Sequence, residues 1–474
     1  MSAVTSSPSS PATQPNKWAI VLTLGGALAV GLGLAAVLTT SWFDLAVAGI
    51  FVAALTAFTL RFPLPGLLLT LALHPFANFF YLNIRPPQEG VPDITVLRAV
   101  VALLFMLTFA RGMTGKIKLS FTSVDFAMLL AGAALALAAV RGRNLVSSLQ
   151  LLLDWYLMPY MMYYIAKHLV TETRHLQQVL WAVAIIGAYN GLYGIFTQTT
   201  GIILWAPENS GFQITQYSDN LRVMRGLLDS PHVFGLVFSI AIPVDFYLLI
   251  KSPTLGRKLA AGAILAITLV ALFYTYKRTA WIATLVSFIV IQFFFPRFRR
   301  ILVVLMLVAG GLTTLYSEEV SGSAVVQERV NQKVDSLNGR TEIWDVAVAA
   351  WQESPIVGHG RGQVPSVRLL ESHYLALLVE GGLVALIPFL LVFVAMLGQI
   401  YRLIRWRFVG MFVSVELFAI LLGVIAAYLV SLYTVVMNRD FPHMLLFILA
   451  GAVLGSHDFF LRKPRAQSEL AESN

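Results

Sequence analysis

The chain has 474 residues, of which 58% are hydrophobic and 12% are charged, and its mean hydropathy is +0.77. Soluble domains carry about twice this share of charged residues, so the composition excludes a soluble protein and predicts a membrane protein. The net charge of +9 is spread mainly over short loops, where it fits anionic lipid headgroups better than nucleic acid. Cysteine is absent, which excludes disulfides and thiolate metal sites.

Residues 1–17 are rich in Ser, Thr and Pro and are predicted to form a disordered tail. Apolar runs follow, each about long enough to cross the ~30 Å hydrocarbon layer as a helix. They predict an all-α polytopic fold with about 12–14 transmembrane helices. Polar residues or proline interrupt two of the runs, at His74 and at Asp154, so a count of twelve or thirteen stays open. The fourteen candidate spans are 18–38, 43–60, 64–80, 95–111, 122–140, 145–167, 176–197, 228–250, 258–276, 279–295, 300–316, 373–400, 411–433 and 441–461.

Lys and Arg clusters in the loops indicate the orientation, because they all fall on one side when the spans alternate. That side is the cytoplasm, and both termini are predicted to lie there. Two long loops, near 198–227 and at 317–372, then lie outside. The predicted organisation is a bundle at 18–316, a large outer loop at 317–372, C-terminal helices at 373–461 and a tail at 462–474.

Lys277 and Arg278 are predicted to lie in a tight outer turn. A single helix over 258–295 would be about 57 Å long, which is far more than a bilayer needs. Two cations are therefore expected at the outer face, where the alternative is a pair that reaches the lipid headgroups.

The large outer loop contains a predicted amphipathic helix over Arg340–Glu353. Its apolar face comprises Ile343, Trp344, Ala347, Val348 and Trp351. The two tryptophans fit membrane anchoring at least as well as sugar stacking. A glycine-rich segment, 358–362, ends the helix and predicts a flexible, cationic loop that can act as a lid.

An ordered series of motifs resembles the superfamily of O-antigen ligases and O-antigen polymerases, which are integral membrane glycosyltransferases. In the most specific motif, a His opens a span and a Glu-Gly pair follows seven residues later, here at His373, Glu380 and Gly381. The sequence has His232 where the family often has Asn, and Arg222 and Arg225 compete for one Arg position. The motifs are Arg225–His232, Lys277–Trp281, Gly339–Trp344, Pro355–Gly360 and Ser372–Gly382.

The resemblance implies an enzyme that transfers a glycan from an undecaprenyl-diphosphate carrier to an acceptor hydroxyl. It implies a bacterial inner membrane protein with a periplasmic site, membrane lipids as surroundings, and no nucleic acid partner. The ligase type, with lipid A–core as acceptor, is favoured over a polymerase that extends the carrier-linked glycan. No cofactor is expected, because motifs for ATP or a catalytic metal are not found in the sequence.

The resemblance assigns His373 as the base that takes the proton of the acceptor hydroxyl. Single displacement by such a base inverts the anomeric configuration. Arg side chains suit a leaving diphosphate because their planar fork binds phosphate oxygens bidentately. Glu380 is expected to support the structure, with Gly381 and Gly382 permitting close helix approach. The diphosphate-binding candidates are Arg225, Arg278, Arg222 and Arg340, with Arg361 as a supporting residue.

Structural roles are the alternative interpretation of these candidate residues. A lone His at a helix start is usually structural, and Arg361 and His359 could be solvated loop residues. A secondary transporter or flippase is a further alternative, because intramembrane acids can mark an ion path. The acids in question are Asp44, Asp125, Asp154, Asp245 and Glu416.

Overall fold

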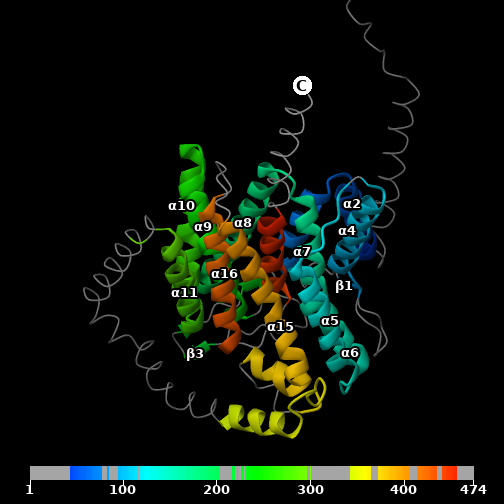
Figure 1. The fold of residues 1–474 in the computed structure, drawn as a ribbon. Helices are drawn as coiled ribbons and strands as arrows, with labels where there is room; N and C mark the ends of the chain where they lie inside the picture. The colour runs from blue at the N-terminus through cyan, green and yellow to red at the C-terminus, as the bar shows by residue number, and fades with distance from the viewer. Residues whose placement is uncertain are drawn as a thin grey trace, which may run out of the picture. The chain divides into compact units, whose positions relative to one another are not determined.

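The computed structural model describes residues 43–76, 83–84, 94–115, 117–202, 216–218, 221–222, 226–228, 230–295, 299, 342–364, 372–405, 414–434 and 440–455. The chain divides into two compact units, residues 1–57 and 58–474. Within the described residues the fold is all-α, and two short antiparallel strand pairs lie in its loops (Figure 1).

The helices follow the apolar runs of the sequence. They are α2 (Phe43–Arg61), α3 (Pro63–Leu73), η1 (His74–Phe76), α4 (Val96–Met113), α5 (Ser123–Val140), α6 (Leu145–Leu152), η2 (Leu153–Leu157), α7 (Met158–Leu169), α8 (Thr173–Thr200), η3 (Gly226–Leu228), α9 (Pro231–Lys251), α10 (Leu255–Tyr274), α11 (Arg278–Phe294), a helix at 342–353, α15 (His373–Arg405), α16 (Val415–Thr434) and the helix Phe441–Gly455. The strands are β1 (Asn83–Ile84) paired with β2 (Ile94–Thr95), and β3 (Gln216–Ser218) paired with β4 (Leu221–Arg222).

The prediction of an all-α polytopic membrane protein is confirmed. In the part of the chain that the structure describes, six helices are long and apolar enough to cross a membrane, namely α5, α8, α9, α10, α15 and α16. The predicted spans 18–38 and 300–316, and the tails 1–17 and 462–474, lie outside the described residues. Each of the other predicted spans contains a described helix.

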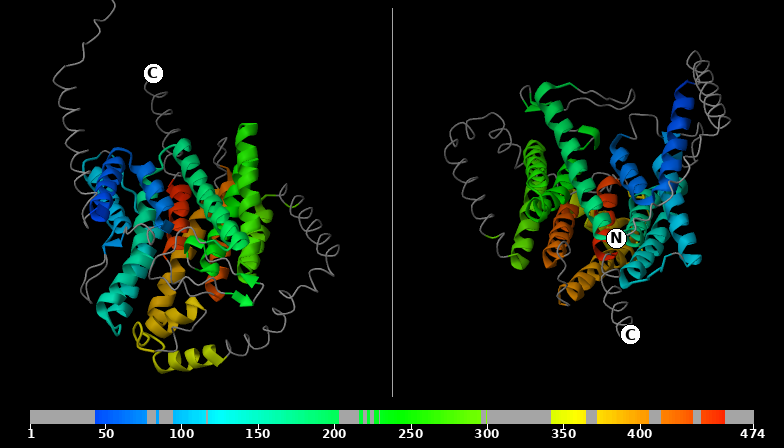
Figure 2. Two further views of the ribbon diagram at one scale, coloured as in Figure 1. Left: turned by 180° about the vertical axis from the view of Figure 1, so that it is seen from behind. Right: turned by 90° about the horizontal axis from the view of Figure 1, so that it is seen from above.

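α9 lies at the centre of one group of helices in the second unit, in contact with α8, α10, α11 and α16 (Figure 2). Small residues bring these helices together: a Cβ added at Gly235 would lie 2.5 Å from Cβ of Ala280, and one at Gly187 would lie 2.8 Å from Cβ of Ala241. Helices in lipid associate through close packing of this kind, since no hydrophobic effect drives them together there.

α5 and α15 pack along each other and carry the two sides of the candidate site. Gly381 permits this approach, because a Cβ there would lie 3.2 Å from Cβ of Ala138. The prediction that Gly382 permits the close approach of another helix is wrong. Its φ of 62° and ψ of −161° interrupt α15, and the segment that approaches it is the loop at 355–358 rather than a helix.

The predicted span 145–167 is one continuous helical segment with a π-helical turn in its middle. α6 ends at Leu152, η2 forms the π turn, and α7 continues to Leu169. A π turn inserts one extra residue and rotates the side chains that follow it, and such turns occur often at functional sites. The turn carries Asp154, Trp155 and Tyr156 into the site described next.

Candidate functional site

His373 is the first residue of α15, where the helix at 342–353 packs against it. Ala347 of that helix is buried with Ala376 and Val379 of α15. The predicted amphipathic face is thereby confirmed from Glu342 onward for four of its five residues, all but Val348. These four pack in one cluster with α15, while Val346 and Ala349 are exposed. Figure 1 shows this helix in yellow, crossing the end of the bundle at which α15 begins.

The tryptophans of this helix have defined partners in the protein. The ring of Trp344 lies 5.5 Å from the ring of Tyr433 in α16, in an edge-on arrangement. Nε1 of Trp351 donates a hydrogen bond to the carbonyl oxygen of Pro355 over 3.2 Å. The helix is therefore fixed to α16 and to the loop that follows it.

That loop is held by the break in α15. N–H groups of His359 and Gly360 donate to the carbonyls of Val379 and Glu380, each over 2.9 Å. N–H groups of Leu383 and Val384 donate to carbonyls of Pro355 and Ile356, each over 3.0 Å. Backbone groups freed by the break thus find partners in the loop, as buried polar groups require.

The segment 358–362, for which a flexible lid was expected, is hydrogen-bonded to its surroundings in this structure. Besides the bonds to α15, the N–H of Arg143 donates to the carbonyl of Arg361 over 2.9 Å. Nε2 of His359 lies 2.6 Å from the carbonyl oxygen of Ala350. The loop forms one wall of the site, and His359 is hydrogen-bonded within it rather than a solvated side chain.

The His373 side chain is 2% exposed, and its Nε2 lies 3.1 Å from the hydroxyl oxygen of Tyr156. The rings of Phe389 and His443 lie 5.5 and 6.1 Å from the His373 ring. The imidazole therefore sits in an aromatic surround with one direct polar contact within the described residues. In this arrangement the imidazole is closed off from solvent.

Two further polar side chains, His443 and Tyr428, lie near His373. The hydroxyl of Tyr428 is hydrogen-bonded to Nδ1 of His443, and both side chains are buried. The ring of His443 also lies 6.3 Å from the ring of Tyr156. Histidines and tyrosines from η2, α15, α16 and the C-terminal helix thus meet at one place in the interior.

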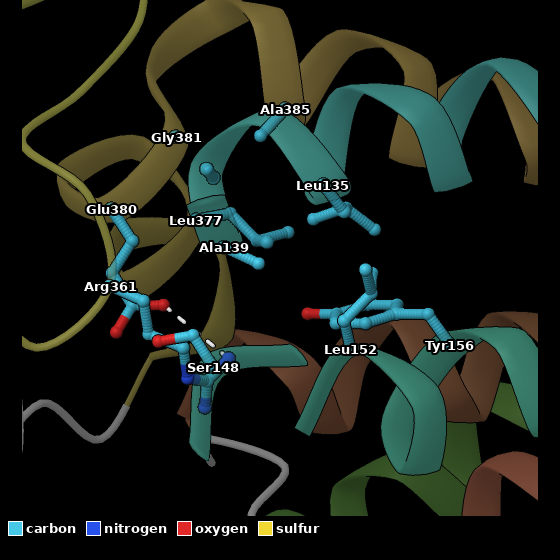
Figure 3. A pocket seen from close by; sticks show the side chains of 11 residues that line it. Leu135, Ala139, Ser148, Leu152, Tyr156, Arg361, Leu377, Glu380, Gly381 and Ala385 are labelled. Atoms are coloured by element: carbon cyan, nitrogen blue, oxygen red, sulfur yellow. Dashed lines mark ion pairs between the residues drawn. The ribbon is translucent and has the colours of Figure 1, made fainter. Parts of the chain in front are cut away.

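Arg361 and Glu380 lie across a small cavity from Tyr156 (Figure 3). Nη1 of Arg361 is 3.7 Å from Oε2 of Glu380, and its Cζ lies 4.4 Å from the centre of the Trp155 ring. The volume in which the centre of a water molecule fits is about 20 Å³, and this suffices for one ordered water. Figure 3 shows the Tyr156 hydroxyl directed into this space.

Arg278 is the first residue of α11, and this end of α11 is connected to the His373 end of α15. Oγ1 of Thr279 lies 2.9 Å from Oγ1 of Thr434, near the end of α16. At the start of α15, the hydroxyl of Tyr374 donates to the carbonyl of Leu429 in α16 over 2.7 Å. α16 therefore brings the starts of α11 and α15 to the same end of the bundle.

The turn before Arg278 has an unusual backbone. Tyr276 has a φ of 50°, in the left-handed region that residues with a Cβ seldom adopt. Nε1 of Trp281 donates to the carbonyl of Leu272 over 3.0 Å, which closes the turn from the α11 side. The predicted break between the two spans at Lys277 and Arg278 is confirmed.

The remaining predicted arginines are less completely described. Arg222 belongs to β4, and its side chain lies outside the described part. Arg225 and Arg340 lie outside the described residues. Among the candidates with described side chains, the structure brings Arg361 and Glu380 together, and both line the cavity that also borders Tyr156.

Sequence reasoning missed Tyr156, Trp155 and Arg98. Arg98 of α4 binds Asp154 bidentately, with Nε–Oδ1 and Nη2–Oδ2 distances of 2.7 and 2.6 Å. Asp154, an acid inside an apolar run, was the available signal for a functional or paired residue. Its partner is 56 positions away in the chain, so the pairing depends on how the helices are arranged.

The intramembrane acids that suggested transport have separate local partners. Asp125 lies 2.5 Å from Nζ of Lys167, and Glu416 lies 3.5 Å from Nζ of Lys251. Asp245 accepts from Oγ1 of Thr268 over 2.9 Å. The side chain of Asp44 lies outside the described part. Within the described residues these three acids therefore contact three different partners on different helices.

Residues 263–390 match the family model described as O-antigen ligase. The matched segment includes α11, the loop with Arg361, and the start of α15 with His373 and Glu380. No curated protein matches the chain. The match agrees with the superfamily that the motifs resemble.

Proposed function

We propose, on the premise that the chain belongs to the O-antigen ligase superfamily, that it moves a glycan from an undecaprenyl-diphosphate carrier to an acceptor hydroxyl. The proposed acceptor is lipid A–core, which makes the protein an O-antigen ligase. The proposed reaction needs neither ATP nor a catalytic metal.

One observation carries this proposal above the others. His373, at the start of α15, lies among polar groups from four segments, while Arg278 begins α11 at the same end of the bundle. The proposed base for the acceptor and the proposed cation for the diphosphate thus lie at the same end of the bundle, which supports a common site for donor and acceptor. The described intramembrane acids of the transport alternative are instead distributed over separate pairs.

The proposed chemistry is a single displacement. The acceptor oxygen forms a bond to the anomeric carbon and gives its proton to His373, while the bond from that carbon to the diphosphate breaks. The bond's electron pair goes to the phosphate oxygen, where Arg278, helped by Arg222, Arg225 or Arg340, stabilises the developing charge. Attack opposite the leaving group inverts the configuration.

The proposed orientation follows from the loop charges. Lys and Arg clusters lie in the loops opposite to the His373 end, so that end is proposed to face the periplasm and both termini the cytoplasm. The membrane is then a bacterial inner membrane. Sugars and acceptor heads would reach the site from the periplasm, and the carrier's lipid chain from the bilayer.

The proposal is tested by transfer with purified protein in detergent or proteoliposomes. Undecaprenyl-diphosphate-linked glycan is supplied with lipid A–core, without ATP and with a chelator present, and products are separated on a gel. A shifted lipid A–core band that is lost in His373→Ala supports the ligase reaction.

Two other outcomes would overturn parts of the proposal. Lengthening of the carrier-linked glycan without lipid A–core would show a polymerase instead. Absence of transfer with either acceptor, by protein that still binds the carrier, would remove the glycosyltransferase assignment and make carrier transport the next assay.

A further inference from the structure

The two ring nitrogens of His373 have different surroundings. Nε2 is within hydrogen-bond distance of the Tyr156 hydroxyl, at 3.1 Å. Nδ1 is buried, and within the described residues it has no hydrogen-bond partner. A neutral imidazole carries its proton on one of the two, and the hydrogen bond of one nitrogen sets the state of the other.

The contact with Tyr156 favours the proton on Nε2. With the proton on Nδ1, a buried N–H would have no acceptor, and unpaired buried donors are rare in folded proteins. With the proton on Nε2, the N–H donates to the Tyr156 oxygen and Nδ1 keeps an open lone pair. A hydroxyl can accept this bond and still donate one of its own.

The cavity supplies a place for that second bond. Tyr156 lines the cavity together with Arg361 and Glu380, and Figure 3 shows its hydroxyl pointing into the space between them. The space holds about one water, which can accept from the Tyr156 hydroxyl. Tyr156 can thus accept from His373 and donate into the cavity at the same time.

The backbone around Tyr156 is fixed where the contact needs it. Tyr156 lies in the π turn of η2, two residues after Asp154. The bidentate pair of Asp154 with Arg98 ties this turn to α4. Tyr156 itself is 3% exposed, and its ring packs edge-on against Phe389 with 6.1 Å between centroids.

We propose that Tyr156 is a positioning residue for the transfer reaction. Its hydroxyl oxygen accepts from Nε2–H of His373, which makes Nδ1 the atom that takes the proton of the acceptor hydroxyl. This inference rests on the proposed function, in which His373 is the base. Nδ1 gains the proton as the new C–O bond forms, and the imidazolium is then held by its Nε2–H···O bond to Tyr156.

The first test compares Tyr156→Phe with Tyr160→Phe. Tyr160 lies one turn later on the same helical segment and is also buried, and its hydroxyl has no hydrogen-bond partner among the described residues. Loss of the His373 contact is expected to lower kcat on the order of tenfold, as for one lost hydrogen bond in the transition state, with KM nearly unchanged. Tyr160→Phe is expected to keep the wild-type kcat.

The second test reads the tautomer directly and does not depend on activity. Protein labelled with ¹⁵N-histidine is studied in membranes by solid-state NMR, and the signals of His373 are identified by their loss in His373→Ala. The expected result is a protonated Nε2 and an unprotonated Nδ1, with the preference reduced in Tyr156→Phe.

The outcomes separate this inference from the proposed function. Protonation of Nδ1 in the wild type, or wild-type kcat in Tyr156→Phe while His373→Ala is inactive, would overturn the positioning role and leave the transferase intact. Full activity of His373→Ala would instead remove His373 as base, whatever the tautomer. Equal losses in Tyr156→Phe and Tyr160→Phe would indicate general damage to the segment formed by η2 and α7 and contradict the specific role.

Discussion

Arg361 and Glu380 approach each other from two different segments, with Nη1 of Arg361 3.7 Å from Oε2 of Glu380 and its guanidinium stacked over Trp155 at 4.4 Å. The pair joins the loop after the helix at 342–353, the α15 helix and the π turn of η2. It therefore links the loop that follows the helix at 342–353 to the helix that begins at His373.

Replacement of Arg361 by Lys tests this coupling. Lys keeps the charge but cannot stack its planar group on Trp155, so a contribution of about 1 kcal/mol is lost. The expected result is a transfer rate lower by about fivefold, measured with the purified protein at saturating donor. The exposed Arg257, at the start of α10, gives the control Arg257→Lys, and equal rates in the two variants would contradict the coupling.

Gly382→Ala is expected to destabilise the protein. A Cβ at this position would lie 2.3 Å from the carbonyl oxygen of Ile356, and the backbone has a φ of 62°. Both the contact and the conformation disfavour a side chain, so we expect a loss of at least about 1–3 kcal/mol. Thermal unfolding followed by fluorescence-detected size exclusion would show a lower midpoint.

Gly398→Ala provides the matched control in the same helix. A Cβ at Gly398 would meet nothing within 4 Å, and its backbone is helical. Alanine favours a helix over glycine, so the midpoint of this variant should equal or exceed that of the wild type. A midpoint for Gly382→Ala as high as that of Gly398→Ala would refute the strain at the break.

Arg98→Ala is expected to cost more stability than removal of both partners of its ion pair. Arg98 and Asp154 are each 14% exposed, and the single variant would leave the Asp154 carboxylate in the bundle without its bidentate partner. Breaking such a pair costs about 3–5 kcal/mol, whereas removing both charges costs much less. The same thermal assay on Arg98→Ala and on Arg98→Ala/Asp154→Ala measures the difference.

Additive losses would contradict this prediction. The cycle also needs the single variant Asp154→Ala. If the fall in the unfolding midpoint of the double variant equals the sum of the falls in the two single variants, the two side chains do not depend on each other. Recovery of stability without recovery of transfer would show, in addition, that the pair serves to hold the π turn with Tyr156.

Arg278→Lys tests the proposed diphosphate contact. Lys presents a point charge and cannot form two parallel hydrogen bonds to phosphate oxygens, so we expect transfer to fall by about tenfold or more. A wild-type rate of transfer by this variant would contradict bidentate binding of the diphosphate by Arg278. Arg299→Lys, at an exposed position on the opposite side in the proposed topology, should retain full activity.

The sequence by itself determined the class of protein and most of its helices. Apolar runs of membrane length need no partner to be recognised, because a spanning helix satisfies its own backbone hydrogen bonds. The amphipathic face around Ala347 and the turn at Lys277 and Arg278 followed from periodicity and length alone. The family motifs indicated His373 and Glu380 as candidate site residues, the cationic loop added Arg361 as a supporting candidate, and the roles of all three remain predictions.

Only the tertiary structure decided which side chains meet. Tyr156 and His373 are 217 positions apart, and their contact depends on a π turn whose extra residue leaves no mark in hydropathy. The break at Gly382 was equally hidden, because a glycine in an apolar run reads as a close helix contact. At this break the backbone of α15 is hydrogen-bonded to backbone carbonyl and N–H groups of the loop. Every residue except proline has both groups, so the sequence cannot show which of them pair, and only the structure does.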